Sequence, residues 1–161
     1  MDEESPYDID VAEDEAAPHP IPAERIKRAV AVTLQRHGRD AARISVALVD
    51  DARMAGLNQR YLGHPGPTDV LSFDLGESDA HAPLEGEIVI SWETAAREAA
   101  CRGHSIEAEA MLYVVHGTLH LVGFDDRSPE AAAAMHAEED RVLTDLGVGA
   151  VYGGHEPWAL G

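Results

Sequence analysis

The chain of 161 residues contains one cysteine, Cys101, so no internal disulfide can form. This excludes a disulfide-stabilised fold and is typical of a protein from a reducing cytosol, in which Cys101 serves as a small packing residue. No apolar run approaches the roughly 20 residues that span a membrane. The N-terminal segment is acidic and lacks the basic and then apolar pattern of a secretion signal. We therefore expect a cytoplasmic protein without a membrane partner.

Basic residues are also scarce, because 12 lysines and arginines face 30 aspartates and glutamates, which gives a net charge of −18. This balance argues against a general nucleic-acid binder, and we expect no DNA partner. The basic residues are unevenly distributed, however. Eight of them lie between Arg25 and Arg60 with only three aspartates, a local charge of +5. That span fits a solvated helix surface as well as it fits a patch that faces RNA.

Two histidines, His116 and His120, stand four residues apart in an apolar stretch. On a helix this spacing places both side chains on one face, where both can bind one ion. Gly123 follows at a position suited to the left-handed conformation that ends a helix. The chain can then turn back and bring Asp126 to the same ion. The sequence therefore predicts a metal site formed by these three side chains, on a helix and the turn after it.

Zinc is the favoured ion, because imidazole and carboxylate ligands suit it and three ligands leave a fourth position open. Two histidines and one carboxylate also describe a non-haem iron site, which is the alternative. The spacing matches the zincin motif, but Gly117 stands where zincins carry their catalytic glutamate. Chance, or a hydrogen-bonded core histidine, would explain the pair alone but not its combination with the glycine and the aspartate.

The stretch from His116 to Asp125, His-Gly-Thr-Leu-His-Leu-Val-Gly-Phe-Asp, resembles a motif of the YbeY family of bacterial endoribonucleases. Residues 57–61, 67–73 and 86–91 resemble further motifs of this family, and all the motifs occur in the order found in the family. The resemblance covers about Ile44 to Gly147. It implies a zinc-dependent, single-strand-specific endoribonuclease that acts in ribosomal RNA maturation and ribosome quality control. The implied partner is ribosomal RNA or the ribosomal particle.

Three positions depart from the family pattern. Asp126 stands where the family usually has a third histidine ligand, Leu62 replaces a functionally important arginine, and Asp74 replaces a proline. The extra carboxylate changes the charge of the metal site. The missing arginine removes a cation that would stabilise charge developing on a phosphate. Arg60 is the nearest substitute, and we take it as the candidate catalytic residue.

Thr68 and Ser72 are the candidate substrate-binding residues, because their hydroxyl groups can donate to phosphate oxygens. Both can equally serve only to fix the turn and the strand in which they lie. Asp69 stands directly after Thr68, and we expect it to stabilise this loop rather than to act in catalysis. Asp125 is an alternative partner for a ring N–H of one of the histidine ligands.

The order of elements predicts an α+β fold with about four strands and about five helices, and the resemblance implies one small mixed sheet covered by helices. We expect a single metallohydrolase domain at 7–150, an acidic tail at 1–6 and a loose tail at 151–161. Strands are predicted at Tyr7–Val11, Arg43–Val49, Val70–Phe73 and Glu87–Ile90. Helices are predicted at Ala23–His37, from a cap at Asp50 or Asp51 to about Tyr61, and from a cap at Ser91 to about Arg102. Two more helices should follow caps at Ser105 and Ser128. The helix after Ser105 should bury one side, formed by Met111, Leu112, Val115 and Leu119.

Two other classes of function stay open on the sequence. The missing arginine favours a non-catalytic ribosome-assembly factor with a structural metal. The zincin-like spacing favours a peptidase, although Gly117 argues against one. Cleavage of single-stranded RNA or of peptides, with and without a chelator, distinguishes the three.

Overall fold

The computed structural model describes residues 6–13, 21–63, 69–76 and 83–148. They contain a four-stranded mixed sheet with the order β1-β2-β4-β3, formed by β1 (Tyr7–Glu13), β2 (Ala42–Val49), β3 (Val70–Asp74) and β4 (Leu84–Ser91). The strands β1, β2 and β4 run parallel, and β3 pairs antiparallel with β4 at the edge of the sheet. The α+β fold with a small mixed sheet is therefore confirmed.

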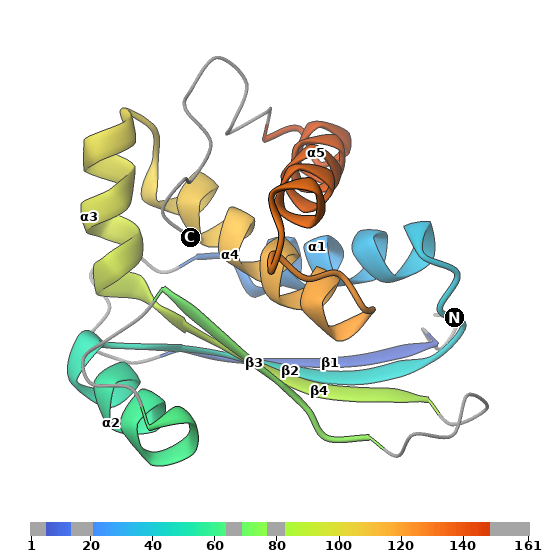
Figure 1. Ribbon diagram of the computed structural model, residues 1–161, viewed down its shortest axis with the longest axis horizontal. Helices are drawn as coiled ribbons and strands as arrows, with labels where there is room; N and C mark the ends of the chain where they lie inside the picture. Colours follow the sequence, from blue (N-terminus) through green and yellow to red (C-terminus); the bar gives the residue numbers. More distant parts are fainter. Residues whose placement is uncertain (1–5, 14–20, 64–68, 77–82, 149–161) are drawn as a thin grey trace.

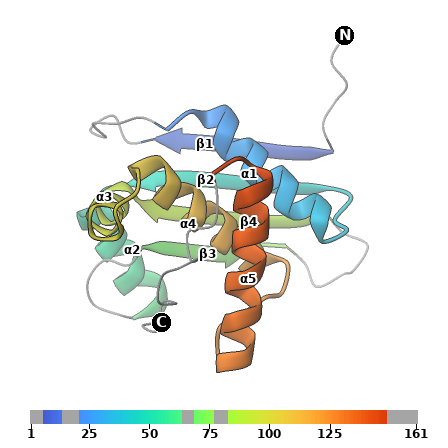
Figure 2. The ribbon, with the colours of Figure 1, turned by 90° about the horizontal axis from the view of Figure 1, so that it is seen from above.

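Five helices accompany the sheet: α1 (Ala23–Arg36), α2 (Asp51–Leu62), α3 (Trp92–Arg102), α4 (Ile106–Leu121) and α5 (Pro129–Asp145). One face of the sheet carries α4 with α1 and α5 around it, and α2 lies against the other face (Figure 1). From above, α5 lies across the C-terminal part of α4 (Figure 2). None of the helices in the described part of the chain combines the length and apolar character needed to cross a membrane.

The helix ends follow local chemistry that the sequence predicted. A side-chain oxygen accepts a hydrogen bond from a backbone N–H of the first turn at Asp50 before α2, Ser91 before α3, Ser105 before α4 and Ser128 before α5. Such caps satisfy amide groups that have no partner within the helix. The largest difference in element bounds is at β4, which begins at Leu84 instead of Glu87.

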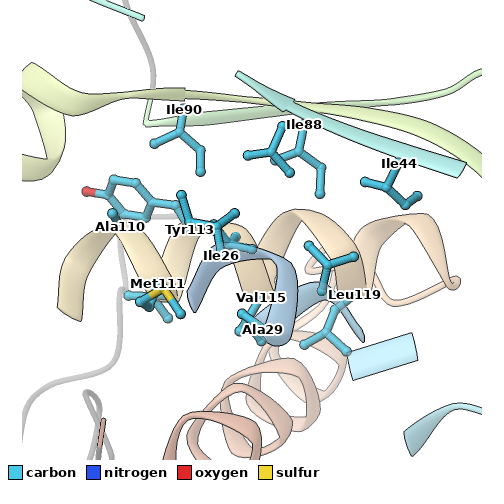
Figure 3. Packing of buried hydrophobic residues seen from close by; sticks show 14 of the residues in the cluster. Ile26, Ala29, Ile44, Ile88, Ile90, Ala110, Met111, Tyr113, Val115 and Leu119 are labelled. Carbon is cyan, nitrogen blue, oxygen red and sulfur yellow. The ribbon is translucent and has the colours of Figure 1, made fainter. Parts of the chain in front are cut away.

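The main core lies between the sheet and α4. Side chains of Ile44, Ile88 and Ile90 point from the sheet toward α4, where Val115 and Leu119 are also buried (Figure 3). The helix is buried along nearly its whole length, because the sheet covers one side while α1, α3 and α5 pack on others. A fully enclosed helix fixes the positions of the polar residues that it carries.

Two glycines allow α4 to approach β4 closely. A Cβ atom at Gly86 would lie 2.6 Å from Cδ1 of Leu121, and one at Gly117 would lie 2.9 Å from Cγ2 of Ile88. Real Cβ atoms essentially never come this close to other atoms. The glycines at these two positions therefore set the distance between the helix and the sheet.

Candidate metal centre

Three predicted ligands meet at the C-terminal end of α4. His116 and His120 lie on the last turns of the helix, and Asp126 follows in the loop after it. One nitrogen or oxygen atom from each residue falls within a group whose members are all within 4.8 Å of one another. The two histidine Nε2 atoms are 3.1 Å apart. Gly123, with φ of 111°, lets the chain turn back, as the sequence predicted.

A buried carboxylate that the sequence did not reveal completes this arrangement. Oε2 of Glu139 on α5 lies 2.5 Å from Nδ1 of His116, and the Glu139 side chain is fully buried. Glutamate is rarely buried without a partner of this kind. A proton on Nδ1 leaves Nε2 free to bind an ion, and carboxylates commonly orient metal-binding histidines in this way.

The surroundings shift the pKa values of the two histidines in opposite directions. Burial lowers the pKa of His116, but the hydrogen bond and negative charge of Glu139 outweigh it, so the pKa lies above the ordinary value. Burial also lowers the pKa of His120, and the neighbouring His116 lowers it further. Two histidines side by side with surrounding carboxylates form a site that a cation would stabilise.

The other oxygen of the same carboxylate gives a second indication of a cation. Among the described residues, Oε1 of Glu139 is buried without a hydrogen-bond partner. An unsatisfied carboxylate oxygen is costly inside a protein unless positive charge lies nearby. A cation bound by His116 and its neighbours would supply that charge, so the donor set fits a metal ion.

Ser72 lies on the side of β3 that faces α4. Alternate residues of a strand point to opposite faces, and Val70 is close to Gly117 on α4. Ser72 therefore shares the face of Val70, and it pairs with Ile88 on β4. Asp69 precedes the strand, and its Oδ1 accepts a hydrogen bond of 2.7 Å from the backbone N–H of Val70.

Arg60, in contrast, is not brought to the metal centre. It is exposed on α2, on the opposite face of the sheet from α4 (Figure 1), and its guanidinium lies 5.7 Å from the centre of the Tyr61 ring. No contact within the described residues joins Arg60 to the three ligands. Thr68 lies outside the described residues. Asp125 accepts a hydrogen bond from the backbone N–H of Arg127.

Half of the cations in the basic span form ion pairs. Four of its eight cations pair with acidic side chains: Arg25 with Glu107, Lys27 with Glu24, Arg36 with Glu138, and Arg43 with Asp8. The first and third pairs join α1 to α4 and α5, and the other two lie on the surface. They favour the interpretation of this span as a solvated helix surface over a continuous patch that faces RNA.

Gly117 explains why the motif lacks the zincin glutamate. A Cβ at this position would point toward β4 and lie 2.9 Å from Cγ2 of Ile88, so a glutamate there would require Ile88 or the helix to shift. A base at Gly117 would also face the sheet instead of the substrate. The structure therefore argues against a peptidase of the zincin type.

The fold and the site together define an α+β domain with a candidate metal centre of two histidines and one carboxylate. The family model described as "Endoribonuclease YbeY" matches residues 11–147. This chain belongs to the YbeY family. Neither alternative, the assembly factor or the peptidase, is favoured by these comparisons.

Two relatives and one solved structure illustrate the extent of the similarity. The Endoribonuclease YbeY of Roseiflexus sp. (strain RS-1) is 40% identical over 156 residues, covering 91% of this chain and 96% of that protein. The Endoribonuclease YbeY of Mycolicibacterium paratuberculosis is 40% identical over 132 residues, covering 76% of this chain and 75% of its own. The solution structure of TM1509 from Thermotoga maritima has a TM-score of 0.57 with 24% identity, covering 85% of this chain and 90% of that one, and shows the shared fold.

Proposed function

We propose that this chain is a zinc-dependent endoribonuclease that cleaves single-stranded RNA and acts on ribosomal RNA during its maturation. The observation that carries the proposal is the meeting of His116, His120 and Asp126 at the end of an enclosed helix. The family to which the chain belongs bears the description of an endoribonuclease. These two findings support the same class of reaction, hydrolysis of a phosphodiester.

Zinc fits the donors better than other common ions. Two imidazoles and one carboxylate are ligands that it binds in open, three-ligand sites, and Glu139 orients His116 in the manner typical of such sites. Iron is the less favoured alternative for the same set. When bound, zinc would act as a Lewis acid and would lower the pKa of a bound water, to about 7 in well-tuned sites.

The residues of the chain then divide the remaining tasks. Glu139 would hold the His116 proton on Nδ1, which would leave Nε2 free to bind the ion. Asp126 adds a negative charge that a third histidine would not. Ser72 lies on the face of the sheet that carries α4, the helix with both histidines. Its hydroxyl group can donate to a phosphate oxygen there. Thr68 is the second candidate for that contact, on sequence alone.

The test is metal analysis together with an RNase assay on protein purified without a metal-binding tag. We expect about one zinc per chain, cleavage of a single-stranded RNA over the same sequence in a duplex, loss of cleavage with a chelator, and recovery on addition of zinc. His120→Ala should remove both metal and cleavage, while His136→Ala, a histidine of α5 outside the site, should keep both. Stoichiometric zinc in His120→Ala, or cleavage that survives complete metal removal, would refute the proposal.

A further inference from the structure

An exposed aromatic side chain, Tyr61, lies on the face of the sheet opposite α4. Tyr61, on the last turn of α2, is 58% exposed. Its ring packs edge-on against Phe73 of β3, with the ring centres 5.5 Å apart and the planes at 63°. The guanidinium of Arg60 lies 5.7 Å from the centre of the Tyr61 ring. We call these three residues, Arg60, Tyr61 and Phe73, the Tyr61 platform.

A single strand, β3, separates the Tyr61 platform from the face of the sheet that carries α4. In β3, Ser72 faces the metal helix, and the next residue, Phe73, faces α2 because side chains alternate along a strand. β3 is an edge strand, since its only partner in the described sheet is β4. A chain that passes around this edge would meet Ser72 on one face and Tyr61 on the other.

We infer that the Tyr61 platform stacks an unpaired base of the single-stranded RNA whose backbone reaches the metal centre around β3. This inference rests on the proposed function. Aromatic rings stack on any base, and a nearby arginine adds a cation contact, which together form a common mode of single-strand binding. Stacking needs no large positive field, and it therefore suits a chain with a net charge of −18.

The platform also gives a reason for single-strand preference. A base inside a duplex is stacked on its neighbours and presents no free face, whereas an unpaired base can swing out onto a protein ring. Arg60 then has a role beside the base instead of at the cleaved phosphate. That role agrees with its place on α2, on the opposite face from the three metal ligands.

The first measurement is binding of a labelled ten-nucleotide single-stranded RNA to the full-length protein, in a chelator so that the probe stays intact. Tyr61→Leu and Tyr61→Gln should each weaken binding about tenfold, the order expected for one stacked base. Tyr61→Phe keeps the ring and should bind within about twofold of the wild type. Leu75→Ala is the matched control, because it shortens an apolar side chain that is similarly exposed, at 62%, but has no ring.

The second measurement shows whether the lost contact is to a base. Abasic nucleotides are placed at each position of the RNA in turn, and binding is compared between wild type and Tyr61→Leu as a double-mutant cycle. At one position or more, the abasic change should weaken wild-type binding about tenfold and leave Tyr61→Leu nearly unchanged. Tyr61→Leu should also keep the wild-type salt dependence, which reports phosphate contacts.

Equal losses in both proteins at every position, no loss at any position, or no wild-type binding in chelator would each overturn the inference. The outcome is separate from that of the proposed function. A protein that shows the cycle but never cleaves RNA would refute the proposed function alone. A protein that cleaves RNA in a zinc-dependent way but shows no cycle would refute the stacking site alone.

Discussion

Replacement of Glu138 by glutamine tests how α5 is held in place. The Glu138 carboxylate accepts hydrogen bonds from Nε and Nη2 of Arg36, at 2.7 and 3.1 Å, and lies 2.9 Å from Nε2 of His37. Arg141 donates a further bond at 3.2 Å. Only 8% of the Glu138 side chain is exposed, so water screens these interactions little. Glu138→Gln removes the charge and keeps the shape.

The magnitude follows from the pKa of this group. The hydrogen bond from Arg36 outweighs burial and lowers the pKa of Glu138 from 4.5 to about 2. At about 1.4 kcal/mol per pKa unit, the ionised form stabilises the folded state by about 3 kcal/mol. Because the folded pKa is the lower one, this contribution is fully present above pH 4.5 or so and is lost as the pH falls toward 2.

The assay is denaturant unfolding followed by circular dichroism at a series of pH values, with a chelator present so that metal release does not contribute. Near pH 6, Glu138→Gln should be less stable than the wild type by about 3 kcal/mol. The gap should shrink between pH 4.5 and 2. Glu24→Gln is the control, because Glu24 is 89% exposed in a surface pair that contributes about 0–1 kcal/mol. A gap that is constant with pH, or equal to that of the control, would refute the reasoning.

Further predictions concern the metal centre and its surroundings. Glu139→Gln should weaken zinc binding by about 10- to 100-fold in a competition titration with a chromogenic chelator, and unchanged affinity would show that the carboxylate does not support His116. Gly117→Ala should lower the free energy of unfolding by about 1–3 kcal/mol. Because Ile88→Ala removes the Cγ atoms that the new Cβ would meet, the double variant should lose less stability than the sum of the two single losses. A Gly117→Ala variant as stable as the wild type would contradict the close approach of α4 to β4. Leu62→Arg should raise the rate of RNA cleavage if the missing cation limits the reaction, and an unchanged rate would show that it does not.

The features predicted correctly from the sequence are those that neighbouring residues determine. The caps at Ser105 and Ser128 and the turn at Gly123 depend on a few consecutive positions, so the sequence specifies them directly. The meeting of His116, His120 and Asp126 is also local, because a helix spacing and one turn produce it. A spacing argument succeeds when all its residues lie within about three helical turns.

The contact between Glu139 and His116 could not be predicted in this way. The two residues are 23 positions apart, and their meeting depends on how α5 packs across α4. In the sequence, Glu138 and Glu139 form part of an ordinary acidic run on a helix, which usually marks a solvated face. Periodicity also predicted only one buried side for α4, because a pattern cannot show that helices cover the other sides.

The placement of Arg60 shows the same limit. Arg60 is two residues from position 62, where the family has its arginine. However, β4 and β3 lie between α2, which carries Arg60, and α4, which carries the histidines (Figure 1). Nearness in sequence therefore did not indicate nearness to the site. The same geometry that removes Arg60 from the ligands places it beside Tyr61, on the other side of the strand that carries Ser72.

The two neighbouring glutamates of α5 connect stability to the metal centre. Successive helix positions point about 100° apart, so Glu138 can face α1 while Glu139 faces α4. His37, a partner of Glu138, also packs edge-on against Phe124, with ring centres 5.0 Å apart, in the loop that leads to Asp126. If α5 acts as a rigid carrier, loss of the Glu138 contacts should weaken zinc binding too, by less than Glu139→Gln does. Unchanged zinc affinity in Glu138→Gln would mean instead that the contact between Glu139 and His116 holds without the remote ion pairs.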